Sequence, residues 1–271
     1  MGDAIIQTGA RQKRKRGTHF HETGEKHQCQ CDIRCNSLAV DGEAFCEEHL
    51  SQCPNKSALT GLEPEYEPNR WNLNKLLRLT HNCFAYAMNI YDTKQIAKCK
   101  DKKKCDASFH QPGFASGHES FSNYAPKTCP NMMVRMFGDN PDIIMSDFTS
   151  QCPPNYSKIA LIIDESDDYH FLRQDKNKYW SHKPGARRVT NLDAAGHKIW
   201  NPKLANYNYR SDKKSDLNYD IFCSYMCVPR GIPLYLKARG GGTRARRAPA
   251  PSPSTKPFRT KKTRRGSRGR R

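Results

Sequence analysis

The sequence lacks a long apolar run. No stretch of eighteen apolar residues occurs in the 271-residue chain, so we expect neither a transmembrane helix nor a membrane partner. The N-terminal residues Met1–Ile6 are too few and too polar for a secretion signal. We therefore expect a protein that is not secreted. Its twelve cysteines should then lie in a reducing compartment, where they are metal ligands, a nucleophile or buried thiols rather than disulfides.

Acidic residues are missing from the C-terminal end. Residues 237–271 contain fourteen Lys and Arg but no Asp or Glu, and residues 11–16 add five more cations. These two sets equal the whole formal net charge of +19, so the rest of the chain is neutral overall. A neutral body is not a basic nucleic-acid-binding domain. It carries two cationic extensions.

The cationic ends also have few apolar residues, so we predict that residues 1–26 and 237–271 are disordered. Such ends can bind nucleic acid or another polyanion through counterion release, without sequence preference. The alternative is a tail that only raises solubility. The candidate contact residues are Arg14, Lys15, Arg16, Arg246, Arg247, Lys261, Lys262, Arg264 and Arg265.

A cysteine-rich module is predicted between the N-terminal arm and the body, at residues 27–53. The spacing of Cys46 and His49 puts two ligands on one turn, and Cys35 stands eleven residues earlier. A structural zinc ion needs four nitrogen or sulfur ligands, and a segment this small lacks a core of its own. Cys29 or Cys31 supplies the fourth ligand, and the spacing does not choose between them. The alternative is a set of free thiols.

A second group of potential ligands has irregular spacing within the predicted body, residues 54–236. A second zinc ion is one interpretation, and buried thiols are the other. Cys223 and Cys227 stand four apart in a predicted strand, which predicts core positions on one face. The candidate ligands of the second group are Cys99, Cys105, His110 and Cys129, with Cys152 beyond them.

Cys83 has the setting of a nucleophile. Residues 79–92 predict a loop followed by a short helix with Cys83 in its first turn, where the helix dipole favours the thiolate. A later histidine can act as its base, either His182 in a turn context or His170 in a strand. We favour His182. The alternatives are a small buried core residue at Cys83 and structural hydrogen bonds at the histidines.

The second half of the chain is dominated by strand patterns. Apolar and alternating runs at 159–164, 169–175 and 179–182 are separated by turn residues and predict a β-meander. Residues 221–229 predict a final strand. A helix that carries a cysteine, followed by an antiparallel sheet, predicts an α+β fold.

Several motifs resemble a family of uncharacterised proteins from giant and other large DNA viruses. The clearest are His81-Asn82-Cys83-Phe84-Ala85-Tyr86-Ala87 and Trp180-Ser181-His182-Lys183-Pro184-Gly185, and the resemblance spans about residues 53–230. It implies a location in the infected host cell, cytoplasm or nucleus, or in the virion.

A more distant similarity links the chain to papain-like cysteine hydrolases of the NlpC or CHAP type. It implies a papain-like α+β core that hydrolyses a peptide or amide bond, with Cys83 as nucleophile. Those enzymes place the base histidine directly before an apolar strand, where this chain has Lys158. The base must then be His182 or His170. The rival hypothesis is a non-enzymatic, zinc-stabilised viral structural or nucleic-acid-associated protein.

Overall fold

The computed structural model describes residues 28–53, 57–100, 109–210 and 215–237. Its centre is a five-stranded antiparallel sheet with the strand order β1-β5-β2-β3-β4. The described strands are β1 (Ile144–Ser146), β2 (Tyr156–Ile163), β3 (Tyr169–Gln174), β4 (Trp180–His182) and β5 (Ile221–Pro229). The described helices are a 3-10 helix η1 (Glu47–His49) and the α-helices α1 (Pro68–Asn72), α2 (Lys75–Thr80), α3 (Cys83–Ala87), α4 (Thr93–Lys100) and α5 (Cys129–Asp139).

The predicted meander is confirmed. β2 pairs with β3 and β3 pairs with β4, both antiparallel, with Leu161 opposite Phe171 and Leu172 opposite His182. β5 is last in sequence but lies between β1 and β2 in the sheet. The α+β prediction is also confirmed, whereas β1 and the helices α1, α2, α4 and α5 were not foreseen.

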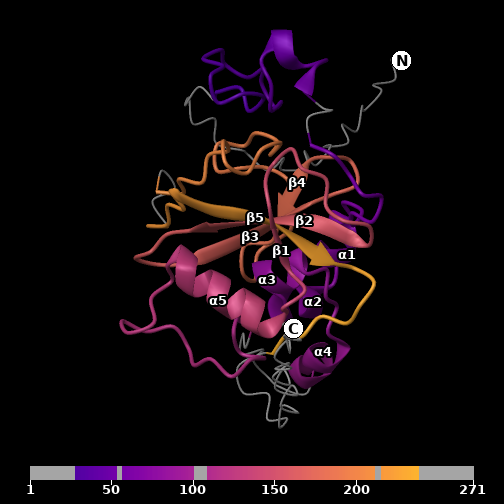
Figure 1. Ribbon diagram of the computed structural model, residues 1–271, viewed down its shortest axis with the longest axis vertical. Helices are drawn as coiled ribbons and strands as arrows, with labels where there is room; N and C mark the ends of the chain where they lie inside the picture. The colour runs from indigo at the N-terminus through magenta and orange to yellow at the C-terminus, as the bar shows by residue number, and fades with distance from the viewer. Residues whose placement is uncertain (1–27, 54–56, 101–108, 211–214, 238–271) are drawn as a thin grey trace, which may run out of the picture. The chain divides into compact units, whose positions relative to one another are not determined.

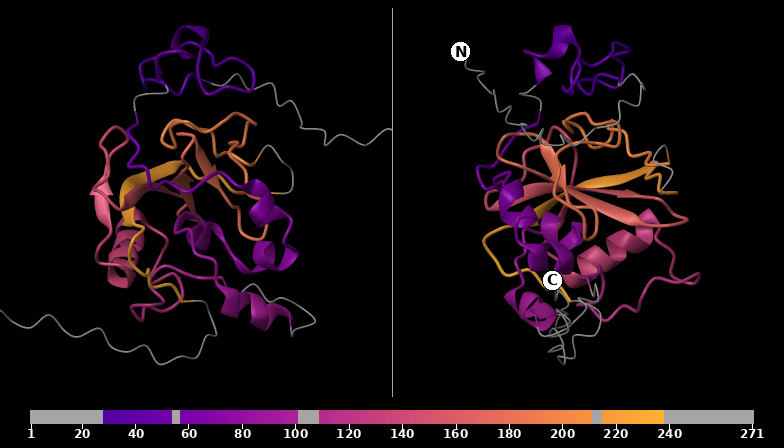
Figure 2. Two further views of the ribbon diagram at one scale, coloured as in Figure 1. Left: turned by 90° about the vertical axis from the view of Figure 1, so that its right-hand side faces the viewer. Right: turned by 180° about the vertical axis from the view of Figure 1, so that it is seen from behind.

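Each face of the sheet carries a different cover. On one face, α3 and α5 pack against Ile159, Leu161 and Phe171 in a continuous apolar cluster. On the other face, Leu172 and Trp180 pack against loop residues from the segment 190–219, among them Ile199, Tyr207 and Tyr219. Figures 1 and 2 show the helices on one side of the strands and the orange loops on the other. We call these the helix face and the loop face.

An asparagine caps the N-terminus of α2, and a second asparagine caps the N-terminus of α3. The Asn74 side chain accepts a hydrogen bond from Leu77 N–H, and the Asn82 side chain accepts one from Ala85 N–H. Each cap satisfies a backbone donor that the first helical turn leaves without a partner. Cys83 is therefore the first residue of α3, as predicted. Among the described residues, no helix combines the length and the apolar character that a membrane crossing requires.

Candidate metal centre and the surroundings of Cys83

Four side chains from residues 28–53 converge on one point. The ligand atoms of Cys29, Cys35, Cys46 and His49 all lie within 4.8 Å of one another. His49 Nδ1 is 3.5 Å from Cys29 Sγ, 3.4 Å from Cys35 Sγ and 3.2 Å from Cys46 Sγ, while the Cys35 and Cys46 sulfurs are 3.9 Å apart. The cluster can hold a metal ion.

These separations match a tetrahedral site. With Zn–S bonds of about 2.3 Å and a Zn–N bond of about 2.0 Å, a tetrahedron has S···S edges of about 3.8 Å and S···N edges of about 3.5 Å. These four distances lie within about 0.3 Å of the tetrahedral values, so the side chains need only small shifts to close around an ion. Three thiols and one imidazole are also a common ligand set for structural zinc.

The choice between Cys29 and Cys31 is settled by a disulfide. Cys31 is bonded to Cys53, with their Cα atoms 5.5 Å apart, so Cys31 is not a metal ligand. Cys29 remains a free thiol and is buried beside His49. The prediction that included Cys31 is therefore wrong. The spacing of the cysteines could not exclude Cys31, because its disulfide partner Cys53 lies further along the chain, after η1.

A glutamine attaches the metal module to the body. Gln30 Oε1 accepts hydrogen bonds from the backbone N–H groups of Trp200 (2.8 Å) and Asn201 (3.0 Å), and Gln30 Nε2 donates to the carbonyl of Lys198 (3.0 Å). The Phe45 ring packs edge-on against Trp200 with a centroid distance of 5.3 Å. The sequence contained no signal for Gln30, because a lone buried amide has no characteristic spacing.

The predicted second zinc site is wrong for its described cysteines. Cys129 forms a disulfide with Cys223, and Cys99 is also disulfide-bonded. His110 Nε2 lies 3.1 Å from a carboxylate oxygen of Asp92 instead of a metal position. Cys105 lies outside the described residues.

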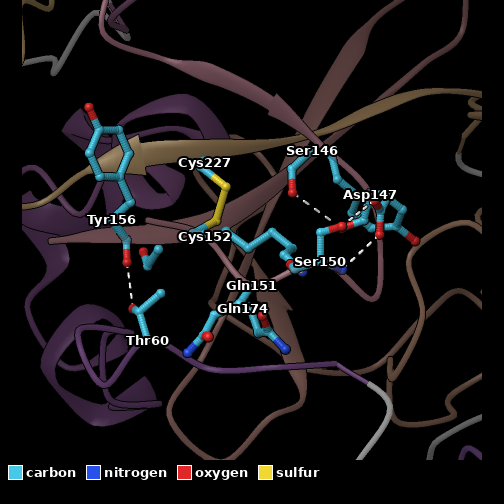
Figure 3. The surroundings of a disulfide bond; sticks show 12 residues. Thr60, Ser146, Asp147, Ser150, Gln151, Cys152, Tyr156, Gln174 and Cys227 are labelled. Carbon is cyan, nitrogen blue, oxygen red and sulfur yellow. Dashed lines mark hydrogen bonds between the residues drawn. A yellow bond between two sulfur atoms is a disulfide. The ribbon is translucent and has the colours of Figure 1, made fainter. Parts of the chain in front are cut away.

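Cys152 is bonded to Cys227 of β5 (Figure 3). Cys152 lies in the loop between β1 and β2. Lys158 of β2 also holds this loop, because its buried ammonium donates to the carbonyls of Phe148 and Ser150. Burial lowers the pKa of Lys158 to about 8. The expectation of reduced cysteines is thus wrong for Cys152 and Cys227, as it is for Cys129, Cys223, Cys31, Cys53 and Cys99. The fold, rather than chain spacing, brings these sulfurs together.

A β-bulge turns Cys223 and Cys227 to opposite faces of the sheet. The register of β5 against β2 shifts between Leu161 and Ile162. Cys227 stands opposite Lys158 on the loop face, whereas Cys223 packs with the cluster on the helix face. An extra residue in one strand reverses the later alternation. The predicted common face is therefore wrong, and β5 is cross-linked on both sides.

Cys83 is buried among apolar side chains on the helix face. It is 5% exposed and belongs to the same cluster as Phe171 and Tyr169. Burial raises the pKa of the Cys83 thiol to about 12, and the nearby carboxylate of Asp168 acts in the same direction. A thiol in this setting stays protonated, which opposes the expected effect of the helix dipole.

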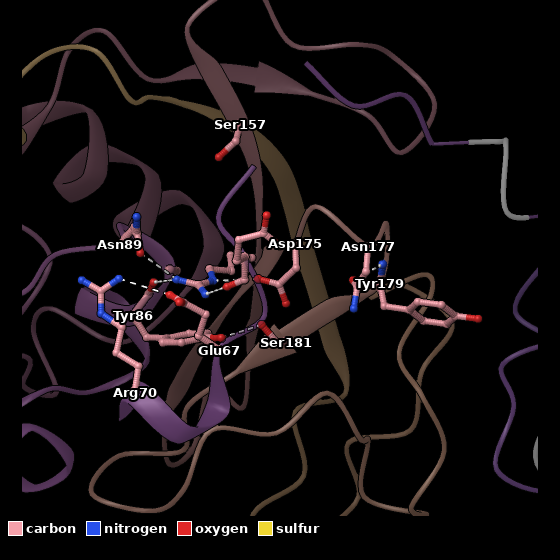
Figure 4. Close-up of polar contacts among 12 residues, drawn as sticks. Glu67, Arg70, Tyr86, Asn89, Ser157, Asp175, Asn177, Tyr179 and Ser181 are labelled. Carbon is pink, nitrogen blue, oxygen red and sulfur yellow. Dashed lines mark hydrogen bonds and ion pairs between the residues drawn. The ribbon is translucent and has the colours of Figure 1, made fainter. Parts of the chain in front are cut away.

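The predicted base histidines lie on the other face. His182 is opposite Leu172, a residue of the loop-face cluster, and paired residues of antiparallel strands share a face. Its neighbour Ser181 points the other way and meets Tyr86 of α3 at 2.7 Å (Figure 4). His170 likewise faces Tyr219, with ring centroids 5.3 Å apart. The sheet therefore separates both imidazoles from Cys83.

Both imidazoles are engaged in structural hydrogen bonds. His182 Nε2 lies 2.9 Å from the Leu192 carbonyl, an acceptor, so this nitrogen carries the proton when the ring is neutral. His182 Nδ1 then accepts from His170 Nε2 at 2.7 Å. Burial lowers the pKa of His182 to about 4 and that of His170 well below its ordinary value. The structure does not assemble the predicted Cys83–His182 pair.

An ion pair lies beneath α3 on the helix face. The guanidinium of Arg173 stacks on the Tyr86 ring at 3.9 Å from its centroid and donates to Asp175 at 2.9 Å. Asp175 is 1% exposed, and burial raises its pKa to about 6. Arg173 also donates to the Tyr86 carbonyl, so these groups brace α3 against β3.

Comparison with known proteins gives one informative match. The chain is 30% identical over 147 residues to insoluble matrix shell protein 1 of Ruditapes philippinarum, an alignment that covers 54% of this chain and 84% of the shell protein. The chain belongs to the family of this shell matrix protein. No protein-family profile matches the chain, and no solved structure matches it.

Membership in the shell matrix protein family does not test the resemblance to viral proteins, which stays a prediction. The papain-like core also stays a prediction. The cationic candidates Arg14, Lys15 and Arg16, and those within 237–271, lie outside the described residues.

Proposed function

We propose that this member of the shell matrix protein family is a non-enzymatic structural protein. Its body is stabilised by one zinc ion and by disulfides, and its cationic ends bind polyanions. The observation that carries the proposal is the position of Cys83. The thiol lies on the helix face, and both candidate bases lie on the loop face in a closed hydrogen-bond chain.

The cross-links suit a structural role. Zinc at the four-ligand site would hold residues 29–49, which contain little regular structure of their own. Among the described residues, one disulfide closes the module and two others anchor β5, one on each face of the sheet. Disulfides persist in oxidising surroundings, which supports our proposal that the protein acts outside the cell. The name of the relative refers to an insoluble matrix, and we propose the same setting here.

The papain-like hydrolase remains the second candidate. It is favoured by one observation: Cys83 is the first residue of a helix that packs on an antiparallel strand. The hydrolase needs a thiolate and a base on the helix face. His81, the histidine next to α3, has both ring nitrogens engaged. Its Nδ1 donates to the Leu77 carbonyl and its Nε2 accepts from the backbone N–H of Asp92. Burial lowers the pKa of His81 to about 4. A location in an infected cell or virion rests on the viral resemblance alone.

Alkylation of Cys83 separates the two candidates. At pH 7 a thiol with a pKa of about 12 is ionised to on the order of one part in 10⁵. We expect iodoacetamide to label Cys83 in the folded protein at least about 100-fold more slowly than in the unfolded chain, because burial removes both thiolate and access. Mass spectrometry of the Cys83 peptide gives the rate.

The pH profile and one variant decide the outcome. The structural proposal expects a labelling rate that rises about tenfold per pH unit from pH 6 to 9, and a rate not slowed in His182→Asn. His118→Asn, at a half-buried histidine away from this pair, is the matched control. Rapid labelling down to pH 5 that His182→Asn abolishes would sink the proposal and establish a thiolate–imidazolium pair. If the His182→Asn variant does not fold, the pH profile of Cys83 labelling in the wild-type protein decides between the two candidates.

Polyanion binding is assigned to the cationic ends. Removal of residues after Leu236 takes away fourteen Lys and Arg. If six to ten of them contact phosphates, the affinity of the full chain for duplex DNA falls by roughly 10³–10⁵ between 50 and 200 mM salt. We expect the truncated chain to lose most of this salt dependence, measured by fluorescence anisotropy. A tail of equal length with Gln in place of Lys and Arg is the control, and retention of the full slope by both variants would move the site to the body.

A further inference from the structure

A small cleft opens on the loop face, on the side of the sheet away from Cys83. Its volume is about 200 Å³, and its walls come from β5, from the segment 202–208 and from the segment 218–220. Tyr207 and Phe222 provide an aromatic floor, and Lys203, Asn218 and Asp220 stand among the lining residues. Neither the metal centre nor the cationic ends includes this cleft.

The wall of the cleft is fixed in place before any ligand arrives. The Asn201 side chain accepts hydrogen bonds from the backbone N–H of Lys203 (3.0 Å) and from the hydroxyl of Tyr225 (2.5 Å). A carboxylate oxygen of Asp193 accepts from the backbone N–H of Asn206 at 3.1 Å. A preorganised wall lowers the entropy that binding must overcome. The metal module adds to this order, because Gln30 holds the start of the same segment.

Several polar side chains that line the cleft are available to a ligand. In the described part of the chain, neither the Lys203 ammonium nor the Asp220 carboxylate has an ion-pair partner, although both are exposed. Asn218 donates its backbone N–H to the Asp164 carboxylate. Its side-chain amide can therefore serve a ligand as both a donor and an acceptor. The Tyr207 hydroxyl also lacks a hydrogen-bond partner among the described residues, but it is fully enclosed and is not one of these available groups.

We propose that this cleft binds a neutral saccharide unit. A sugar ring presents adjacent hydroxyls that can pair with an amide and a carboxylate, and its C–H face can pack on an aromatic floor. One cation, Lys203, and one anion, Asp220, line the cleft, so its formal charge is zero and a neutral ligand suits it. Drug-sized pockets span about 300–1,000 Å³, so a cleft of this size takes one ring and leaves the rest of a polysaccharide outside.

This inference goes beyond the structural role and does not use the cationic ends. The test is titration of the full chain, by calorimetry, with two uncharged probes, a glucose tetramer and an N-acetylglucosamine tetramer. We expect at least one probe to bind with a Kd of about 0.1–1 mM. Asn218→Ala and Asp220→Asn should each weaken binding about tenfold, because each removes hydrogen bonds to the sugar. Asn69→Ala, an exposed asparagine on α1, should leave the affinity unchanged.

Two results would overturn the proposal. One is no saturable heat with either tetramer up to about 10 mM. The other is binding that both cleft variants leave unchanged. A conservative Asn218→Asp substitution, checked by circular dichroism, covers the case in which Asn218→Ala disturbs the fold. A uronic-acid tetramer reports on the cationic ends separately, so failure with neutral probes leaves the polyanion proposal standing.

Discussion

Replacement of Cys46 with serine is expected to release the metal ion and to unfold residues 28–53. Cys46 is buried and lies 3.2 Å from His49 and 3.9 Å from Cys35, so its loss removes one ligand from a four-ligand set. Structural zinc contributes about 10–16 kcal/mol of apparent folding free energy in small zinc-binding modules, far more than residues 28–53 can recover through their own packing. Elemental analysis should give about one zinc per wild-type chain and none in the variant.

Cys83→Ser is the matched control, because Cys83 is also a free, buried thiol but lies outside the metal cluster. It should keep the full zinc content. A second measurement follows the contact through Gln30. Hydrogen exchange of the Trp200 and Asn201 amides should become faster when zinc is chelated, since Gln30 holds both. If the purified protein contains no zinc and these amides are still protected from exchange, the proposal that a zinc ion stabilises the protein is wrong.

Loss of the Cys129–Cys223 disulfide should lower the free energy of unfolding by about 4 kcal/mol. The bond spans 94 residues, and closing a loop of that length removes roughly 4.5 kcal/mol of chain entropy from the unfolded state. The double variant Cys129→Ala with Cys223→Ala tests this by urea unfolding. Double replacement avoids a lone thiol and keeps the comparison to the cross-link itself.

The Cys152–Cys227 pair offers an internal comparison on the loop face. Its separation of 75 residues predicts nearly the same loss, about 4 kcal/mol. Each pair has one cysteine on β5, so the two losses should not add fully. A change below about 0.5 kcal/mol in either double variant, the size of an ordinary surface substitution, would contradict a stabilising role for that bond.

The strands were predictable because their patterns are local. β2 is a continuous apolar run, and turn residues separate β3 and β4 from it, so the meander follows from the sequence. The face of each side chain was not predictable. β3 is buried on both sides, so His170 and Phe171 alternate between two covered faces, and alternation cannot say which one meets α3.

The metal site was predictable to three of its four ligands. The spacing of Cys46 and His49 is set by one turn of η1, which is local information. The choice of Cys29 over Cys31 depends on Cys53, and the second group failed because Cys129 meets Cys223 only through the tertiary fold. The bulge opposite Leu161 has no mark in the sequence, and it alone sends Cys223 to the helix face.

The place of β5 has a consequence for biosynthesis. Of the described strands, β5 leaves the ribosome last, yet it lies between β1 and β2 and carries one cysteine of each of two disulfides. At about 5–20 residues per second, Cys129 waits roughly 5–20 s before its partner is translated. During that interval Cys129 and Cys152 are both thiols without their native partners. The native Cys129–Cys223 and Cys152–Cys227 bonds can therefore form only after β5 has been translated.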